Sequence, residues 1–328
     1  MDEIDILFTI YDQSKIKNSF TKSETPDFIL TDPINNLKIG VEITTLYSHQ
    51  ASAILKDDRF KDKFIKENKP NFKSKKKPKY LKRLNTTILE GGVDFSQIVG
   101  HGIWYTADAN DFFDFFENII KKKNKSYEFL DGLEFVNLIA KDEENFAKSN
   151  KVNPGEIYGY LRNHSLFKTI ISSNFQEIYL ISEFHSGTYN IPLKWYIFHS
   201  EYELFINFWN NHLNIDSKQK NDLDLQLKNF CVCLILLGFE RVYFFYDMSG
   251  NKYIVFGNTY WRINLEKKLI EEETFLGKSL EKKNEMRNIL KNYENYTNIF
   301  NLYLKFRNTL VPNFKDDFFI KISLNNSM

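Results

Sequence analysis

Two acidic residues, Asp27 and Glu42, have the type and spacing that hydrolytic chemistry requires. Asp27 precedes the apolar run 28–30, and Glu42 lies in the alternating segment 38–44. A turn centred midway between the two acids would place them opposite each other in a hairpin, where opposed side chains have Cβ atoms about 4.5–5.5 Å apart. Two like charges at that separation repel each other, and a divalent cation is the simplest bridge between them.

Magnesium is the cation that best suits such a pair. It prefers hard oxygen ligands and takes one or two protein carboxylates, while water and a substrate phosphate complete its shell. Such an ion, or Mn²⁺ in its place, polarises a phosphoryl oxygen and lowers the pKa of an attacking water. The pair therefore predicts metal-assisted hydrolysis of a phosphate ester. The alternative is a structural hairpin whose acids are solvated on an exposed face.

The elements that would position the two acids follow from hydrophobic periodicity. Residues 2–13 predict a helix with acids at its start, where the helix dipole favours them. Residues 26–47 predict a β-hairpin, because apolar and polar side chains alternate in its second strand. Residues 108–129 predict a long helix that begins acidic and ends basic, and 135–140 and 177–182 predict buried strands.

The C-terminal part has a different pattern. Residues 192–230 are aromatic and predict helices, and a turn near 247–251 joins two apolar runs into a second hairpin. Residues 264–310 are charged and predict helix. We place a domain boundary between 188 and 189, which divides the chain into residues 1–188 and 189–328.

The N-terminal part resembles the PD-(D/E)XK nuclease superfamily, the restriction-endonuclease-like proteins. The resemblance rests on Pro26-Asp27, fourteen intervening residues, and Glu42-Ile43-Thr44. It extends over residues 1–185, where the order helix, hairpin, basic helix and strand is similar to the family core. It implies an α/β fold with a mixed sheet flanked by helices, followed here by a mostly helical C-terminal part that contains a β-hairpin.

The resemblance also implies roles for particular residues. Asp27 and Glu42 would be metal ligands for Mg²⁺ or Mn²⁺. In many members an acid on the preceding helix joins the metal site, and here Glu3 is the first candidate and Asp5 the second. The usual chemistry of the family is metal-dependent cleavage of phosphodiester bonds.

One position departs from the family pattern. The family has a lysine two residues after the glutamate, and this chain has Thr44, which cannot supply a positive charge. Some members place the lysine on the following helix instead. Lys122 and Lys125 share one face of that helix by their i, i+3 spacing. The resemblance therefore points to Thr44, Lys122 and Lys125 as catalytic residues beside Asp27 and Glu42.

A basic stretch between residues 69 and 83 holds eight Lys and Arg side chains and no acid, although the whole chain has a formal net charge of only +1. Basic side chains neutralise phosphates, and interleaved aromatic side chains can stack on bases. The stretch therefore predicts a nucleic-acid contact, the alternative being a solvated surface loop. The predicted contacts are Lys73, Lys75, Lys76, Lys77, Lys79, Lys82 and Arg83.

Composition excludes several other classes of protein. With 42% hydrophobic residues, 31 Phe and 18 Tyr, the chain is not wholly disordered. No apolar run is long enough to cross a membrane, and the first residues are acidic where a signal peptide is basic. Cys231 and Cys233 lie in an apolar run and are too few for a disulfide framework. We expect a cytoplasmic protein with two buried thiols.

These patterns favour a metal-dependent nuclease, with DNA favoured over RNA as the substrate and restriction or anti-phage defence as the context. The C-terminal part would select the target, form a homodimer or dock a partner such as an ATPase. Two alternatives remain: a degenerate nuclease fold that binds nucleic acid or protein without cutting it, and a structural subunit in which the acids are incidental.

Overall fold

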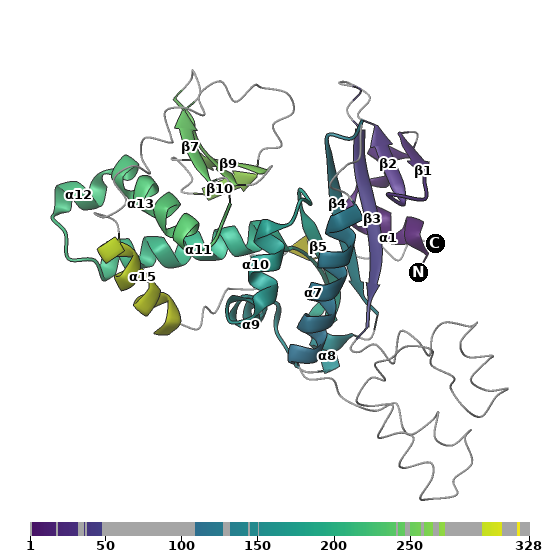
Figure 1. The fold of residues 1–328 in the computed structure, drawn as a ribbon, viewed down its shortest axis with the longest axis horizontal. Helices are drawn as coiled ribbons and strands as arrows, with labels where there is room; N and C mark the ends of the chain where they lie inside the picture. The colour runs from purple at the N-terminus through teal and green to yellow at the C-terminus, as the bar shows by residue number, and fades with distance from the viewer. Residues whose placement is uncertain are drawn as a thin grey trace, which may run out of the picture.

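A mixed β-sheet with helices on both faces forms the larger part of the fold (Figure 1). The coordinates are a computed structural model. It describes residues 2–47, 109–272, 297–309 and 320–321, except for short gaps at 18, 32–35, 37, 127–131, 144, 150, 241, 247–249, 257–258 and 265–268.

The strands of this sheet lie in the order β1-β2-β3-β4-β5-β6-β11. The central strands β3, β4 and β5 are parallel, and every other neighbouring pair is antiparallel. The strands are β1 (Phe20–Lys22), β2 (Phe28–Thr31), β3 (Lys38–Leu46), β4 (Phe135–Asp142), β5 (Ile178–Phe184), β6 (Gly187–Pro192) and β11 (Ile320–Lys321).

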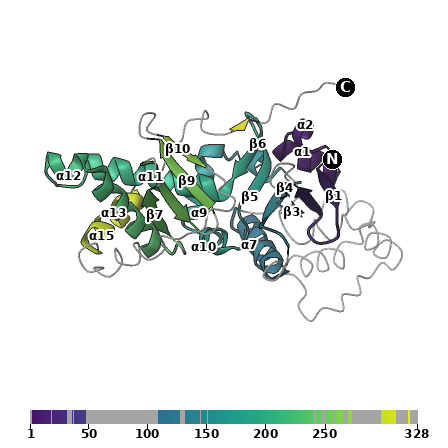
Figure 2. The ribbon, with the colours of Figure 1, turned by 90° about the horizontal axis from the view of Figure 1, so that it is seen from above.

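Helices precede, connect and follow these strands, and a second, antiparallel sheet lies beside the C-terminal helices (Figures 1 and 2). The helices are α1 (Glu3–Ile10), α2 (Gln13–Ile16), α7 (Ala109–Ser126), α8 (Phe146–Ser149), η1 (Pro154–Glu156), α9 (Ile157–Arg162), α10 (Ser165–Ser172), α11 (Leu193–Asn211), α12 (Ser217–Asn221), α13 (Leu223–Leu236) and α15 (Thr297–Thr309). The second sheet has the order β10-β9-β8-β7, formed by β7 (Tyr243–Tyr246), β8 (Lys252–Phe256), β9 (Thr259–Asn264) and β10 (Leu269–Glu272).

The two faces of the large sheet carry separate hydrophobic cores because side chains alternate along each strand. On one face Val41 and Ile43 of β3 pack with Leu7 of α1 and Ile139 of β4. The other face is covered by α7 and α10, and its core continues into the C-terminal helices. Figure 2 shows α1 and α7 on opposite sides of the sheet. Side chains of β3 that lie between Val41 and Ile43 in sequence therefore face α7.

The described part of the chain confirms the predicted α/β architecture. The helix predicted at 2–13 is α1, and its start is stabilised by reciprocal hydrogen bonds in which the Asp5 N–H donates to the Asp2 carboxylate and the Asp2 N–H donates to Asp5. The hairpin is β2–β3, and the long helix is α7. The predicted strands at 135–140 and 177–182 are β4 and β5, and each ends two residues later than predicted.

The prediction of helix over residues 264–310 is wrong in part. Thr297–Thr309 is helical, but Leu269–Glu272 is strand β10, which pairs with β9. A two-stranded hairpin is marginally stable alone in water. Here β9 adds to the free edge of β8 and β10 adds to β9, so the predicted hairpin β7–β8 becomes a four-stranded sheet. Tertiary strand pairing outweighs the local pattern of charges.

The boundary predicted between residues 188 and 189 lies inside β6, which pairs with β5 along its whole length. Buried side chains before and after this point pack in one cluster, including Phe116 of α7, Tyr196 of α11 and Phe230 of α13. The two sides therefore share a core. Both cysteines are buried and unbridged, as predicted. Within the described ranges, no helix combines the length and the apolar character needed to cross a bilayer.

The buried His199 of α11 gives the fold a pH dependence. Its side chain is 7% exposed and lies against Trp195. Burial lowers its pKa from 6.5 to about 4. Between pH 6.5 and pH 4, His199 is protonated in the unfolded chain and neutral in the folded chain. The free energy of unfolding therefore decreases as the pH falls through this range.

We expect the free energy of unfolding to fall by about 3 kcal/mol more in the wild type than in His199→Phe between pH 6.5 and pH 4. Urea unfolding of both proteins at half-unit pH intervals measures the difference. Parallel curves for the two proteins would show that His199 does not carry this dependence.

Candidate functional site

Asp27 and Glu42 lie opposite each other, as the sequence predicts. Phe28 pairs with Val41, and the same register continued by one residue sets Asp27 across from Glu42. β2 begins at Phe28, whereas β3 continues to Leu46 and has only β4 beside it there. Among the described residues, the edge of β3 beyond Val41 therefore has no strand beside it on the β2 side, and the Asp27 carboxylate contacts this edge.

The Asp27 carboxylate is held by the edge of β3. Its Oδ2 accepts a hydrogen bond from the Ile43 N–H at 2.7 Å, and the side chain is half-buried. Burial raises the pKa of this carboxyl group. The Ile43 N–H lowers the pKa, and the negative charges of Glu42 and Glu3 raise it. Three carboxylates thus influence one another at this end of the sheet.

Glu42 is 3% exposed and faces α7. Its Oε1 accepts a hydrogen bond from the ammonium group of Lys123, which lies near the end of α7 and is partly exposed. An acid this deeply buried requires a counter-charge, because desolvation of an unpaired carboxylate is costly. Lys123 supplies that charge from the helix that covers this face of the sheet.

Glu3 lies at the start of α1 and forms an ion pair with Lys22 of β1, with 2.8 Å between Nζ and Oε2. Both side chains are exposed, and the hydrogen bond and charge of Glu3 raise the pKa of Lys22. A cavity of about 480 Å³ opens here, and Glu3 and Lys22 line it together with Thr44 and Thr45 of β3. The predicted residues Glu3 and Thr44 are therefore neighbours in space.

The α7 lysine that contacts Glu42 is Lys123, which is not one of the predicted lysines. Lys122 and Lys125 are exposed on α7, and Lys123 contacts Glu42. The pattern of α7 explains this placement: Ile119 packs against the core and Ile120 is buried, and Lys123 follows them at spacings of four and three. These spacings lie on one helix face. The apolar stripe was thus the sequence signal for Lys123.

The basic stretch at residues 69–83, with its predicted contacts from Lys73 to Arg83, lies outside the described residues.

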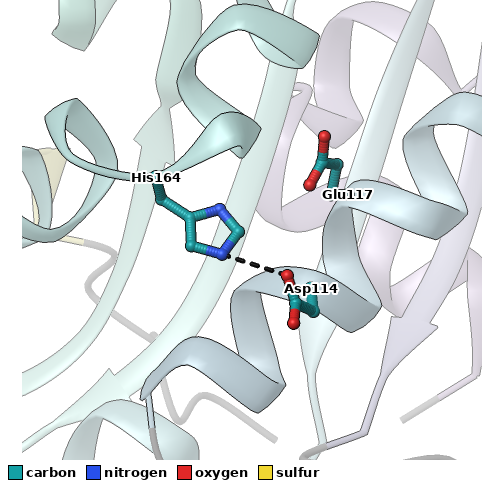
Figure 3. A group of neighbouring side chains, drawn as sticks. All are labelled: Asp114, Glu117 and His164. Atoms are coloured by element: carbon teal, nitrogen blue, oxygen red, sulfur yellow. Dashed lines mark ion pairs between the residues drawn. The ribbon is translucent and has the colours of Figure 1, made fainter.

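A second group of ligand-type side chains lies where α7 meets the start of α10 (Figure 3). In the described part of the chain, Asp114, Glu117 and His164 form the one set of three such residues with ligand atoms within 4.8 Å of each other; Asp27, Glu42 and Glu3 are not that close.

The hydrogen bonds of this second group give it a structural role, because they link α7 to α10. His164 Nε2 is 3.2 Å from the Asp114 carboxylate, and its Nδ1 accepts from the Leu166 N–H at 3.0 Å. The Glu117 carboxylate accepts from Ser165 at 2.5 Å and Thr169 at 2.8 Å, and it pairs with Lys121. His164 Nε2 and both carboxylate oxygens of Glu117 thereby join α7 to the start of α10, while His164 Nδ1 caps α10.

No protein-family profile, curated protein or solved structure matches this chain. The case for a function therefore rests on the residues and their arrangement.

The absence of a side chain at Gly40 allows Pro26, the residue before Asp27, to pack closely against β3. A Cβ at Gly40 would lie 2.8 Å from Cγ of Pro26 and 3.0 Å from side-chain atoms of Leu133 and Val136. The proline ring cannot turn away as a long side chain would. Overpacking of this kind costs about 1–3 kcal/mol.

We expect Gly40→Ala to lower the free energy of unfolding by about 1–3 kcal/mol in urea titrations. The matched control is Gly159→Ala in α9, where a Cβ would have no atom within 4 Å; there we expect a gain of up to about 1 kcal/mol. Equal stability of the two variants would contradict the close packing of Pro26 on Gly40.

Proposed function

We propose that this protein is a metal-dependent nuclease that hydrolyses phosphodiester bonds, and that DNA is its substrate. The observation that carries the proposal is the meeting of Asp27 and Glu42 at one end of the sheet with Lys123 against Glu42. A polyanionic substrate requires both kinds of charge: acids that hold a cation, and a cationic side chain that contacts the phosphate.

The donor set fits a hard divalent cation. Asp27 and Glu42 offer carboxylate oxygens, Glu3 stands nearby on α1, and the raised pKa of Asp27 reflects burial and the repulsion among these acids. Such a set matches the preference of Mg²⁺ or Mn²⁺ for oxygen ligands. The bound ion would polarise the phosphoryl oxygen and lower the pKa of the attacking water.

The chain's own residues have separable roles in this proposal. Asp27 and Glu42 hold the cation and orient it through the rigid edge of β3. Lys123 donates to a non-bridging oxygen of the phosphate and stabilises the charge that develops there. Thr44 offers a hydroxyl where the family pattern has a lysine. The basic stretch at 69–83 would contact the phosphate backbone on either side.

A second candidate function is a degenerate nuclease fold that binds nucleic acid without cutting it. Thr44 favours this reading, because its side chain cannot replace the charge of a lysine. The C-terminal helices would then serve target choice, dimerisation or docking to a partner such as an ATPase. Tight, salt-sensitive binding to DNA without cleavage would select this function.

A cleavage assay tests the proposal. The purified protein is incubated with supercoiled plasmid, linear duplex, single-stranded DNA and structured RNA, with Mg²⁺, with Mn²⁺ or with chelator, and Asp27→Asn serves as the control for contaminating nuclease. We expect metal-dependent cutting of DNA that the variant lacks. Cutting of RNA alone would change the substrate class, and equal cutting by the variant would refute the assignment.

A further inference from the structure

Two acids of the candidate site, Glu42 and Glu3, each form an ion pair with a different lysine. Glu42 pairs with Lys123 of α7, and Glu3 pairs with Lys22 of β1. Asp27 is influenced by the charges of both acids and accepts a hydrogen bond from the Ile43 N–H of β3. The two lysines come from elements on different sides of the sheet edge, so they approach the acids from opposite directions.

The carboxylates of this group favour the binding of a divalent cation. The negative charges of Asp27, Glu42 and Glu3 are joined by that of Asp2, which lines the same cavity as Glu3 and Lys22. A divalent cation offsets part of this negative charge, which makes the approach of a phosphodiester group less unfavourable. Because ammonium groups and a divalent cation compete for the same carboxylate oxygens, the cation and the two lysines cannot all hold Glu42 and Glu3 in full.

We propose that Lys22 and Lys123 are exchangeable counter-ions: they hold Glu3 and Glu42 until a divalent cation binds, and the released ammonium groups then contact the phosphodiester. This inference rests on the proposed function. It assigns Lys22 a role that nothing in the sequence pattern suggests. It also gives the site a built-in order, in which the cation binds first and the lysines become available to the substrate afterwards.

Both lysines have the solvent exposure that exchange requires. The side chain of Lys123 is 31% exposed and that of Lys22 is 64% exposed, so each ammonium group can move into water once a cation replaces it on its acid. Lys22 also borders the cavity that Thr44 and Thr45 line. A phosphate entering there would meet the ammonium group of Lys22.

Cation affinity tests the proposal without any turnover. Isothermal titration calorimetry measures the binding of Ca²⁺ and Mg²⁺ to the whole protein in the absence of nucleic acid. Removing a competing charge beside the acids should tighten binding, by about tenfold in Lys123→Met and about threefold in the more exposed Lys22→Met. Lys218→Met is the matched control, since α12 lies at the far end of the molecule from α1 in Figures 1 and 2.

The outcomes separate this inference from the proposed function. Unchanged or weaker Ca²⁺ binding in Lys123→Met, in a wild type that binds Mg²⁺ and cleaves DNA, overturns the exchange alone. A wild type that binds neither ion overturns both proposals. The exchange is supported if one cation binds per chain, if both lysine variants bind it more tightly than the wild type, and if Lys218→Met binds it with unchanged affinity.

Amine labelling of the wild-type protein gives a second measurement that needs no variant. Reductive methylation followed by peptide mass spectrometry reports the accessibility of each lysine. Saturating Ca²⁺ should raise the labelling rate of Lys22 and Lys123 several-fold relative to Lys218. Equal rates with and without Ca²⁺ would show that the lysines stay on their acids and would overturn the proposal.

Discussion

Replacing Glu42 by glutamine is expected to lower the rate of metal-dependent DNA cleavage by about 1,000-fold, which corresponds to about 4 kcal/mol of activation free energy. Glutamine keeps the size of the side chain and an oxygen that can still accept from Lys123. It removes the negative charge that the cation requires. The loss should therefore come from the chemistry and leave the fold intact.

Single-turnover cleavage of labelled duplex DNA measures this effect. Glu134→Gln is the matched control, because Glu134 is an exposed acid just before β4, and its rate should stay within about twofold of the wild type. We also expect Ca²⁺ to raise the melting temperature of the wild type and to leave that of Glu42→Gln unchanged. Full activity in Glu42→Gln would leave the acids of this hairpin with a structural role only.

The same assay distinguishes three of the four lysines of α7. Lys123 contacts Glu42, whereas Lys122 and Lys125 are exposed. A greater loss of cleavage in Lys123→Met than in Lys122→Met or Lys125→Met would support the assignment made from the structure. The reverse order would support the assignment made from the resemblance.

Replacing Arg307 by methionine is expected to lower the free energy of unfolding by about 3–5 kcal/mol. The Glu201 side chain is fully buried, and both of its oxygens accept hydrogen bonds from Arg307 of α15, at 2.6–3.0 Å. Tyr158 and Tyr303 also donate to this carboxylate, at 2.5 and 2.7 Å. Without Arg307, the buried Glu201 carboxylate would lose its counter-ion.

Urea unfolding measures this loss, with Lys305→Met as the control on the exposed side of the same helix. The control should change stability by no more than about 0.5 kcal/mol. The double variant Glu201→Gln, Arg307→Met should be more stable than the sum of its single variants, because it leaves no unpaired charge. A loss below 1 kcal/mol in Arg307→Met would show that this ion pair does not anchor α15.

Local sequence signals were sufficient for much of the site. The register of β2 and β3 follows from the position of the turn and from alternation, so Asp27 and Glu42 were correctly predicted to lie opposite each other. The capped start of α1 follows from Asp2 and Asp5. These features depend on residues a few positions apart, and such signals persist in any tertiary context.

Other features depend on contacts between distant parts of the chain. Strand β1 has only three residues, too few for a periodic pattern, and it forms because it pairs with β2. Strand β10 lies in a charged segment that predicts helix, and it forms on the edge of β9. In both cases a neighbouring strand supplies the backbone hydrogen bonds that the local sequence does not specify.

The sequence by itself determined the acids, the hairpin that opposes them and the helix that supplies a lysine, because turn residues and hydrophobic periodicity act over short distances. Only the tertiary structure decided which lysine reaches Glu42 and that Lys22 stands beside Glu3. The rotation of α7 is set by its buried phenylalanines and isoleucines against β4, α8 and α10, and Lys22 is placed by the pairing of β1 with β2. Both placements depend on packing between segments that are far apart in the chain.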